Sequence, residues 1–302
     1  MKINAESVSK TFYRSTGSIH AVHEVSWRGS KGQVHGIIGP NGSGKTTLIR
    51  MILGSVQPDK GTIYVEGSDT FNQTQLFRNQ TGYLPEERGV YPNLRAEEFL
   101  LYLAQLHHLD RDSALSRIAT YLEELNLAGN RRTLLRDFSK GMLQKIQLIA
   151  AFLHNPSLIV LDEPFSGLDP VNIRLVRSFI QRHKKRGALV VLCTHMMDEA
   201  ERLCDMITMF HKGRILNSGP TGELRRTLGE MSVTVTSEET LPKLNTAQLL
   251  IRKGSSQSFI LNRKASLLNL LGELNERGIT YSELHYCPTR LEEIFIRAIQ
   301  DE

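Results

Sequence analysis

The sequence lacks the features of a secreted, membrane-spanning or metal-binding chain. No apolar run approaches the roughly 18 residues that a membrane-spanning helix needs, and residues 1–8 do not resemble a signal peptide. The 3 cysteines, Cys193, Cys204 and Cys287, do not have the spacing of a metal site. Repeats and low-complexity segments are also absent. We therefore expect a globular, cytosolic chain that crosses no membrane itself and has buried, inert thiols.

Charge of neither sign is concentrated in one part of the chain. The 37 Lys and Arg exceed the 32 Asp and Glu, and the net charge of +5 is spread along the sequence. This excess is compatible with an anionic membrane surface and is only weak support for nucleic acid. The basic run Arg182–Arg186 comes directly before Gly187, so we interpret it as the end of a helix, where cations complement the helix dipole. No nucleic-acid partner is expected.

Hydrophobic patterning predicts an α/β fold. Short apolar runs rich in β-branched residues, separated mostly by helical stretches, are typical of a largely parallel sheet covered by helices. These runs are residues 33–38, 158–161, 188–193 and 205–210. Strand patterns without intervening helices predict an antiparallel part at residues 2–8, 19–27 and 61–67. A helical insert is expected at about residues 95–155, with helices at 96–109, 111–127 and 139–154.

The pattern changes after Leu228, and 302 residues leave room for about two domains. Strands are predicted at 231–236, 258–261 and 279–286, and helices at 264–276 and 290–299. We therefore expect two domains, at residues 1–228 and 229–302, the second being a small α+β domain. Thr289 and Glu292 are expected to form a capping box before the last helix. The apolar faces of the two helices are Leu267, Leu268, Leu270, Leu271 and Leu274, and Leu291, Ile294, Phe295, Ala298 and Ile299.

A glycine-rich motif follows the first buried strand. The sequence Gly39-Pro-Asn-Gly-Ser-Gly-Lys45-Thr46 comes between a predicted strand and a predicted helix, which is the context of a phosphate-binding loop. Glycines let the backbone N–H groups point at phosphate oxygens. We expect ATP and Mg²⁺ as cofactors, with Lys45 bridging the β- and γ-phosphates and Thr46 binding Mg²⁺. The predicted nucleotide-binding residues here are Gly39, Pro40, Asn41, Gly42, Ser43, Gly44, Lys45, Thr46 and Thr47.

Two adjacent carboxylates end the apolar run at residues 158–161. Asp162 and Glu163 repel each other, so a nearby cation is a natural reason for their position. Asp162 is expected to bind Mg²⁺, directly or through water, and Glu163 to polarise the attacking water. A solvated strand end is the alternative for this motif alone. Pro164 and the run Gly167-Leu168-Asp169-Pro170 favour an ordered active-site loop, in which Asp169 lies near the nucleotide.

His195 follows the run at residues 188–193 in the same way. A lone histidine is usually structural. The carboxyl edge of a parallel sheet, however, is where ligands bind in such folds. We therefore expect His195 to donate a hydrogen bond to the γ-phosphate and to act in catalysis together with Lys45 and Glu163.

These motifs, in this order, resemble those of the ATP-binding cassette (ABC) ATPases over about residues 2–228. The resemblance implies a P-loop NTPase core with a mixed sheet, followed here by the C-terminal domain. Phe138-Ser139-Lys140-Gly141-Met142 resembles the family signature, usually Leu-Ser-Gly-Gly-Gln. In the family, this helix N-terminus closes on the nucleotide held by the other subunit of a head-to-tail dimer. Ser139 and Gly141 inherit that role.

Three further residues are predicted to belong to the nucleotide site: Lys140, Glu86 and Phe12. Lys140 departs from the signature, and either a nearby phosphate or pairing with Asp137 explains it. Glu86 replaces the family glutamine and is expected to bind Mg²⁺. Phe12 matches the aromatic that stacks on adenine, with Tyr13 and ordinary strand packing as alternatives.

The resemblance extends to the drug- and sodium-efflux branch of bacterial ABC ATPases. It implies an energising subunit of an exporter, bound through a separately encoded integral membrane permease to the inner face of the cell membrane. The second ATPase subunit of this exporter is expected to be another copy of the chain or a paralogue. The segment 87–94, with Tyr91 and Pro92, is the expected socket for the permease. A soluble ABC protein acting on ribosomes, DNA or iron-sulfur assembly is the alternative.

Overall fold

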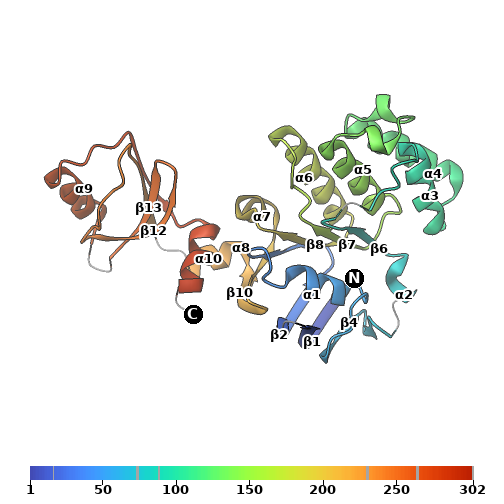
Figure 1. Cartoon of the computed structure of the whole chain (residues 1–302), viewed down its shortest axis with the longest axis horizontal. Coiled ribbons are helices and arrows are strands. Elements are labelled where there is room, and N and C mark those ends of the chain that lie inside the picture. The colour runs from blue at the N-terminus through green and yellow to red at the C-terminus, as the bar shows by residue number, and fades with distance from the viewer. Residues whose placement is uncertain (16, 73–74, 88, 229–230, 263–264, 301–302) are drawn as a thin grey trace. The chain divides into compact units, whose positions relative to one another are not determined.

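The computed structural model describes the chain except for residues 16, 73–74, 88, 229–230, 263–264 and 301–302. It divides into two compact units, Met1–Ser218 and Gly219–Glu302 (Figure 1). The domain boundary predicted after Leu228 stays a sequence-based prediction, and helix α8, Thr221–Thr227, lies between the two positions. Within the described residues, no helix is both long and apolar enough to cross a membrane.

A six-stranded sheet forms the centre of the first unit. Its strands β3, β8 and β9 pair in parallel, as do β6, β7 and β8. Every residue of β3, β7 and β8 is buried, which explains why these strands are continuous apolar runs in the sequence. In spatial order the strands are β10 (Arg214–Pro220), β9 (Met206–His211), β3 (Val34–Ile38), β8 (Leu189–Thr194), β7 (Leu158–Asp162) and β6 (Thr81–Leu84).

The predicted antiparallel part forms a separate four-stranded sheet. Its order is β2 (Gly17–Ser30), β1 (Lys2–Arg14), β4 (Lys60–Val65) and β5 (Ser68–Asp69). Helix α1, Lys45–Ile52, lies with this sheet on one side of the parallel sheet (Figure 1). Buried side chains of both sheets and of α1 share one apolar core, including Ile3, Trp27, Ile37, Leu48 and Val191. This core fixes the position of the loop that precedes α1.

The other helices of the first unit are α2 (Gln75–Arg78), α3 (Ala96–Leu106), α4 (Arg111–Glu124), α5 (Lys140–Phe152), α6 (Pro170–Lys185) and α7 (Met197–Leu203). Helices α3 to α6 lie on the opposite side of the parallel sheet from α1 (Figure 1). The predicted insert helices are confirmed in position, although α3 ends three residues early because His108 has a left-handed φ of 57°. The basic run is a helix end, as predicted: α6 stops before Gly187, and Arg182 and Lys184 form ion pairs with Glu124 and Asp205.

The second unit is a four-stranded antiparallel sheet with helices. The order is β12 (Ala247–Lys253), β13 (Ser256–Leu261), β11 (Met231–Thr236) and β14 (Glu283–Pro288). Helix α9, Leu267–Glu276, contributes Leu270 and Leu274 to the apolar core, which also contains Val233 and Phe259. Strand β12 was not predicted, because polar or charged residues occupy three of its seven positions, Gln248, Arg252 and Lys253, and its apolar residues do not alternate regularly with them.

Several finer predictions for this unit differ from the structure. Strand β14 begins at residue 283 and not at 279, and α9 begins at Leu267 after its cap Ser266; Lys264, the predicted start, lies outside the described residues. Leu268 is 78% exposed, so it does not belong to the buried face of α9.

The last helix, α10 (Leu291–Gln300), buries Leu291, Ile294 and Phe295, whereas Ala298 and Ile299 are half-buried. The Glu293 carboxylate accepts the Arg290 backbone N–H at 2.8 Å, and Glu292 contacts Lys253. The predicted pairing of Thr289 with Glu292 stays a prediction.

The cysteine prediction is only partly right. Cys193 and Cys204 are buried, and burial raises the pKa of both thiols, which makes them unreactive. Cys287, in the edge strand β14, is half-buried.

Candidate active site

The loop between β3 and α1 has the backbone geometry of a phosphate cradle. Gly42 and Gly44 have φ angles of 78° and 105°, in the left-handed region that favours glycine. A Cβ atom at Gly44 would lie 2.0 Å from the Ala21 carbonyl oxygen, and one at Gly39 would lie 2.1 Å from the Phe210 carbonyl oxygen. The loop is therefore confined between β2 and β9, and a glycine-rich loop at a helix N-terminus is the arrangement in which backbone N–H groups bind phosphate oxygens.

Lys45 lies inside this loop. Its side chain is buried, and its Nζ donates hydrogen bonds to the carbonyl oxygens of Gly39 at 2.8 Å and Pro40 at 2.9 Å. The ammonium group is thus already positioned where a triphosphate would pass. Phosphate oxygens are better acceptors for it than the two neutral carbonyls, because they carry negative charge and the ammonium attracts them electrostatically.

Thr46 connects the loop to the carboxylate at the end of β7. Its hydroxyl donates to Asp162 at 3.0 Å. Burial raises the pKa of Asp162 to about 6; the Thr46 hydrogen bond and Lys45 oppose this effect, and the charges of Glu86 and Glu163 reinforce it. A cation beside these carboxylates would relieve that repulsion.

The oxygen groups of Thr46, Asp162 and Glu86 fit Mg²⁺, which prefers oxygen ligands and usually keeps phosphate and water in its coordination shell. In the described part of the chain, no cluster of three or more His, Cys, Asp or Glu side chains is close enough to hold a metal ion unaided. These three residues therefore suit a metal ion that is also coordinated by the nucleotide phosphates.

Glu163 is held in one orientation. Its carboxylate accepts hydrogen bonds from the Thr194 hydroxyl at 3.1 Å and from the His195 backbone N–H at 3.0 Å, and it lies 2.9 Å from His195 Nδ1. The Glu163 backbone has a left-handed φ of 51°, which is strained for a residue other than glycine. From α5, the buried Gln144 amide donates to the carbonyl oxygens of Glu163 at 3.5 Å and Pro164 at 3.4 Å.

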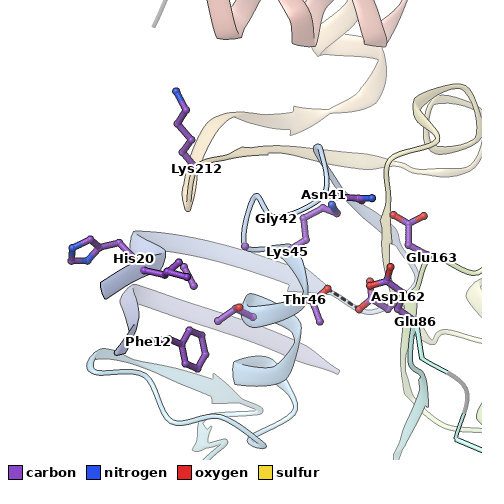
Figure 2. Close-up of a pocket in the computed structure, with 14 residues that line it drawn as sticks. Phe12, His20, Asn41, Gly42, Lys45, Thr46, Glu86, Asp162, Glu163 and Lys212 are labelled. Atoms are coloured by element: carbon purple, nitrogen blue, oxygen red, sulfur yellow. Dashed lines mark hydrogen bonds between the residues drawn. The ribbon is translucent and has the colours of Figure 1, made fainter. Parts of the chain in front are cut away.

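A cavity of about 660 Å³ brings most of the predicted residues together (Figure 2). In Figure 2, Glu86, Asp162 and Glu163 lie on one side of the phosphate loop, and Phe12 and His20 lie on the other. The lining residues are Phe12, Ile19, His20, Ala21, Asn41, Gly42, Gly44, Lys45, Thr46, Thr47, Glu86, Asp162, Glu163 and Lys212.

Phe12 lines the cavity, whereas Tyr13, which is 85% exposed, does not. This arrangement favours Phe12 as the adenine-stacking residue. His20 and Lys212 also line the cavity but were not predicted, because no local sequence pattern marks them. His20 lies in β2, and Lys212 lies in the turn between β9 and β10. Pairing of β1 with β2, which puts Thr11 opposite His20, is what brings His20 to the site.

The signature residues and Asp169 do not line this cavity. Ser139 caps α5, its hydroxyl accepting the Met142 N–H at 3.3 Å, and Asp169 caps α6. The methylene groups of Lys140 lie against Gly167, where an added Cβ would be 3.2 Å from Lys140 Cε. Asp137 forms its ion pair with Arg136, at 3.9 Å, and not with Lys140 as the alternative interpretation expected.

Comparison with known proteins identifies the family. Residues 22–166 match the family described as ABC transporter. The chain is 37% identical over 239 residues to the uncharacterized ABC transporter ATP-binding protein YhaQ of Bacillus subtilis (strain 168), and the match covers 79% of this chain and 78% of YhaQ. The chain belongs to the ABC transporter ATP-binding proteins.

Two further comparisons show how far the likeness extends. The daunorubicin resistance ATP-binding protein DrrA3 of Streptomyces coeruleorubidus is 29% identical over 294 residues, which cover 95% of this chain and 93% of DrrA3. The similarity to this ABC transporter ATP-binding protein therefore includes the C-terminal unit. The chain is also similar to a solved structure of the ATP binding subunit of an ABC transporter. The match covers 75% of this chain and 92% of the solved chain, with a TM-score of 0.69 and 31% sequence identity. These matches confirm the predicted ABC ATPase fold and activity.

Proposed function

We propose that this ATPase energises an exporter, through a dimer that closes head to tail on two ATP molecules. The observation that carries the proposal is the division of the predicted site: the phosphate loop, Asp162 and Glu163 line one cavity, whereas Ser139, Gly141 and Asp169 do not. A complete site then needs a second copy of the chain or a paralogue.

Within one chain, each polar group has a separate role. The loop backbone and Lys45 bind the β- and γ-phosphates. Thr46, Asp162 and Glu86 hold Mg²⁺, which supplies charge neutralisation on the phosphates when it is bound. Glu163 accepts the proton of the attacking water, and Thr194 and His195 keep its carboxylate in place. Phe12 stacks on the base.

The other half of the site comes from the second subunit. Ser139 and Gly141 at the start of α5 present a hydroxyl and backbone N–H groups to the γ-phosphate. Lys140 adds a positive charge, since its ammonium has no ion pair among the described residues. His195 of the chain that binds the nucleotide completes the site. Its side chain is 53% exposed, which leaves it free to make the predicted contact with the γ-phosphate.

A permease is the proposed membrane partner, and it would hold the ATPase at the inner face of the cell membrane. DrrA3 is named a daunorubicin resistance ATP-binding protein, and export of a drug is a direct way for an ABC transporter to give resistance. The segment 87–94 and the following helix α3 present exposed aromatic and apolar side chains: Tyr91 is 54%, Tyr102 41% and Leu106 55% exposed. Tyr91 packs edge-on against Phe99 and Tyr102, with ring centroids 6.1 and 5.9 Å apart. We assign these exposed residues to the proposed docking surface for the permease.

Copurification with the candidate permease from a neighbouring reading frame tests this proposal. Tyr91→Asp is expected to abolish copurification while ATPase activity of the isolated chain stays intact. Tyr281→Asp is the matched control, because Tyr281 is also an exposed tyrosine, at 41%, but lies in the C-terminal unit. Equal recovery of the permease with the parent and with both variants would rule out the proposed socket.

A further inference from the structure

The C-terminal unit contains a cavity that is lined by none of the residues assigned to ATP hydrolysis. Its volume of about 560 Å³ lies within the range of about 300–1,000 Å³ typical of small-molecule sites. The cavity opens beside strand β12 and the loop that connects β11 to β12. Its apolar lining is Leu241, Pro242, Leu244, Ala247, Leu249 and Phe259, and its polar lining is Lys243, Gln248 and Asn262.

The cavity continues the apolar core of this unit. Leu249 in β12 lies opposite Phe259 in β13, so both side chains point to the face of the sheet that packs on α9. Phe259 is 2% exposed, but Leu249 is 46% exposed. Helix α9 therefore covers the middle of this face and leaves its β12 edge open. An apolar ligand that covers the exposed part of Leu249 would remove apolar surface of both molecules from water, which favours binding.

The loop that walls the cavity is fixed by two buried polar side chains. Gln257, which is 1% exposed, accepts the Leu241 N–H at 3.2 Å. Glu273, which is 8% exposed, accepts the backbone N–H groups of Asn245 at 2.8 Å and Thr246 at 2.9 Å. These contacts hold both halves of a loop that has no regular secondary structure. The cavity is therefore preformed, and a ligand would not have to order the loop on binding.

The charge at the cavity indicates which class of ligand it accepts. Lys243 is the charged residue among those that line it, and the described residues provide no ion pair for its ammonium group. Its backbone carbonyl accepts a hydrogen bond from Arg277 at 3.1 Å, and the Arg277 charge is balanced by an ion pair with Glu273, so Lys243 supplies the positive charge at this end of the cavity. Gln248 and Asn262 add neutral polar groups to the lining.

We propose that this cavity binds small apolar acids, with the hydrocarbon part on Leu244, Leu249 and Phe259 and the acidic group near Lys243. The site is independent of the nucleotide site, and nothing in the proposal depends on dimerisation. It assigns to the C-terminal unit the role of a ligand-binding domain of an ABC transporter ATP-binding protein.

Binding of dodecanoate to the full-length chain, measured by isothermal titration calorimetry below its micelle concentration, tests the proposal. Dodecanol is the neutral analogue. The parent is expected to bind one dodecanoate per chain and to bind dodecanol about five-fold more weakly, which is the size of one exposed ion pair. Lys243→Met is expected to weaken dodecanoate by the same factor and to leave dodecanol unchanged.

Leu249→Asp places a carboxylate at the open edge and is expected to weaken dodecanoate at least ten-fold. Leu268→Asp is the matched control, since Leu268 is an exposed leucine of the same unit and does not line the cavity. Circular dichroism and ATP turnover check that both variants fold. Absence of saturable binding to the parent, or equal binding by the Leu249 and Leu268 variants, overturns the proposal. Equal affinity for dodecanoate and dodecanol overturns the assignment of an acid.

Discussion

Replacing Asp162 with asparagine is expected to stabilise the nucleotide-free protein while it abolishes ATP turnover. The carboxylate is 1% exposed, and burial together with the charges of Glu86 and Glu163 raises its pKa from 3.8 to about 6. Asparagine has nearly the same shape, and its amide oxygen still accepts the hydrogen bond from Thr46. The substitution therefore removes the buried charge and keeps the packing.

The size of the stabilisation by Asp162→Asn and its pH dependence follow from the raised pKa of Asp162. Because the folded chain holds the Asp162 proton more tightly than the unfolded chain, ionisation costs no stability below about pH 4, and the full cost appears above about pH 6. Two pKa units correspond to about 3 kcal/mol as an upper limit. A unit of about 200 residues then gains about 2–4 °C in melting temperature per kcal/mol.

Thermal unfolding followed by circular dichroism, with EDTA and without nucleotide, measures this gain. Asp162→Asn is expected to melt above the parent at pH 8, and the difference should fall by about half at pH 5. Asp198→Asn, at an exposed position in α7, is the control and should change stability by less than about 0.5 kcal/mol. An unchanged or lower melting temperature of Asp162→Asn at pH 8 would refute the electrostatic strain assigned to this site.

Four further substitutions separate the roles of the site residues. Lys45→Ala is expected to lose ATP binding, whereas Glu163→Gln should keep it and lose about 10²–10⁴-fold in kcat, measured by nucleotide titration and steady-state turnover; parental turnover by the glutamine variant would contradict the assigned base. Glu86→Gln should keep turnover but raise the Mg²⁺ concentration for half-maximal activity, and an unchanged titration would remove Glu86 from the metal site. Gln144→Leu should lower kcat about five-fold with little change in KM, whereas Gln147→Leu, equally buried on α5, should not; equal kcat values would mean that Gln144 does not position Glu163.

The nucleotide site could be predicted because its residues occur in short motifs at the ends of buried strands. The runs before Gly39, Asp162 and His195 are the strands β3, β7 and β8, and parallel pairing brings their carboxyl ends to one edge. Such strands are buried on both faces, so their apolar runs are easy to recognise. A local pattern was thus sufficient to place groups that are more than 100 residues apart in the chain.

Residues that reach the site through tertiary pairing could not be predicted. His20 depends on the register of β1 with β2, and Lys212 depends on the turn after β9. Gln144 contacts Glu163 only because α5 packs against the end of β7. Strand β12 was missed for a related reason: it is an edge strand, and its alternation of apolar and polar residues is interrupted by a bulge near Leu250.

The most direct test of the account is the mass of the Glu163→Gln variant with and without ATP. Ser139 and the phosphate loop are assigned to the same composite site but lie apart in one chain, so ATP must bring two chains together. Light scattering at saturating Mg²⁺-ATP is expected to show twice the 34.1 kDa of one chain, and the monomer without nucleotide. Adding Ser139→Glu should block the dimer, because it places a negative charge against the γ-phosphate. A Glu163→Gln protein that stays monomeric at saturating Mg²⁺-ATP would contradict the head-to-tail dimer of this chain.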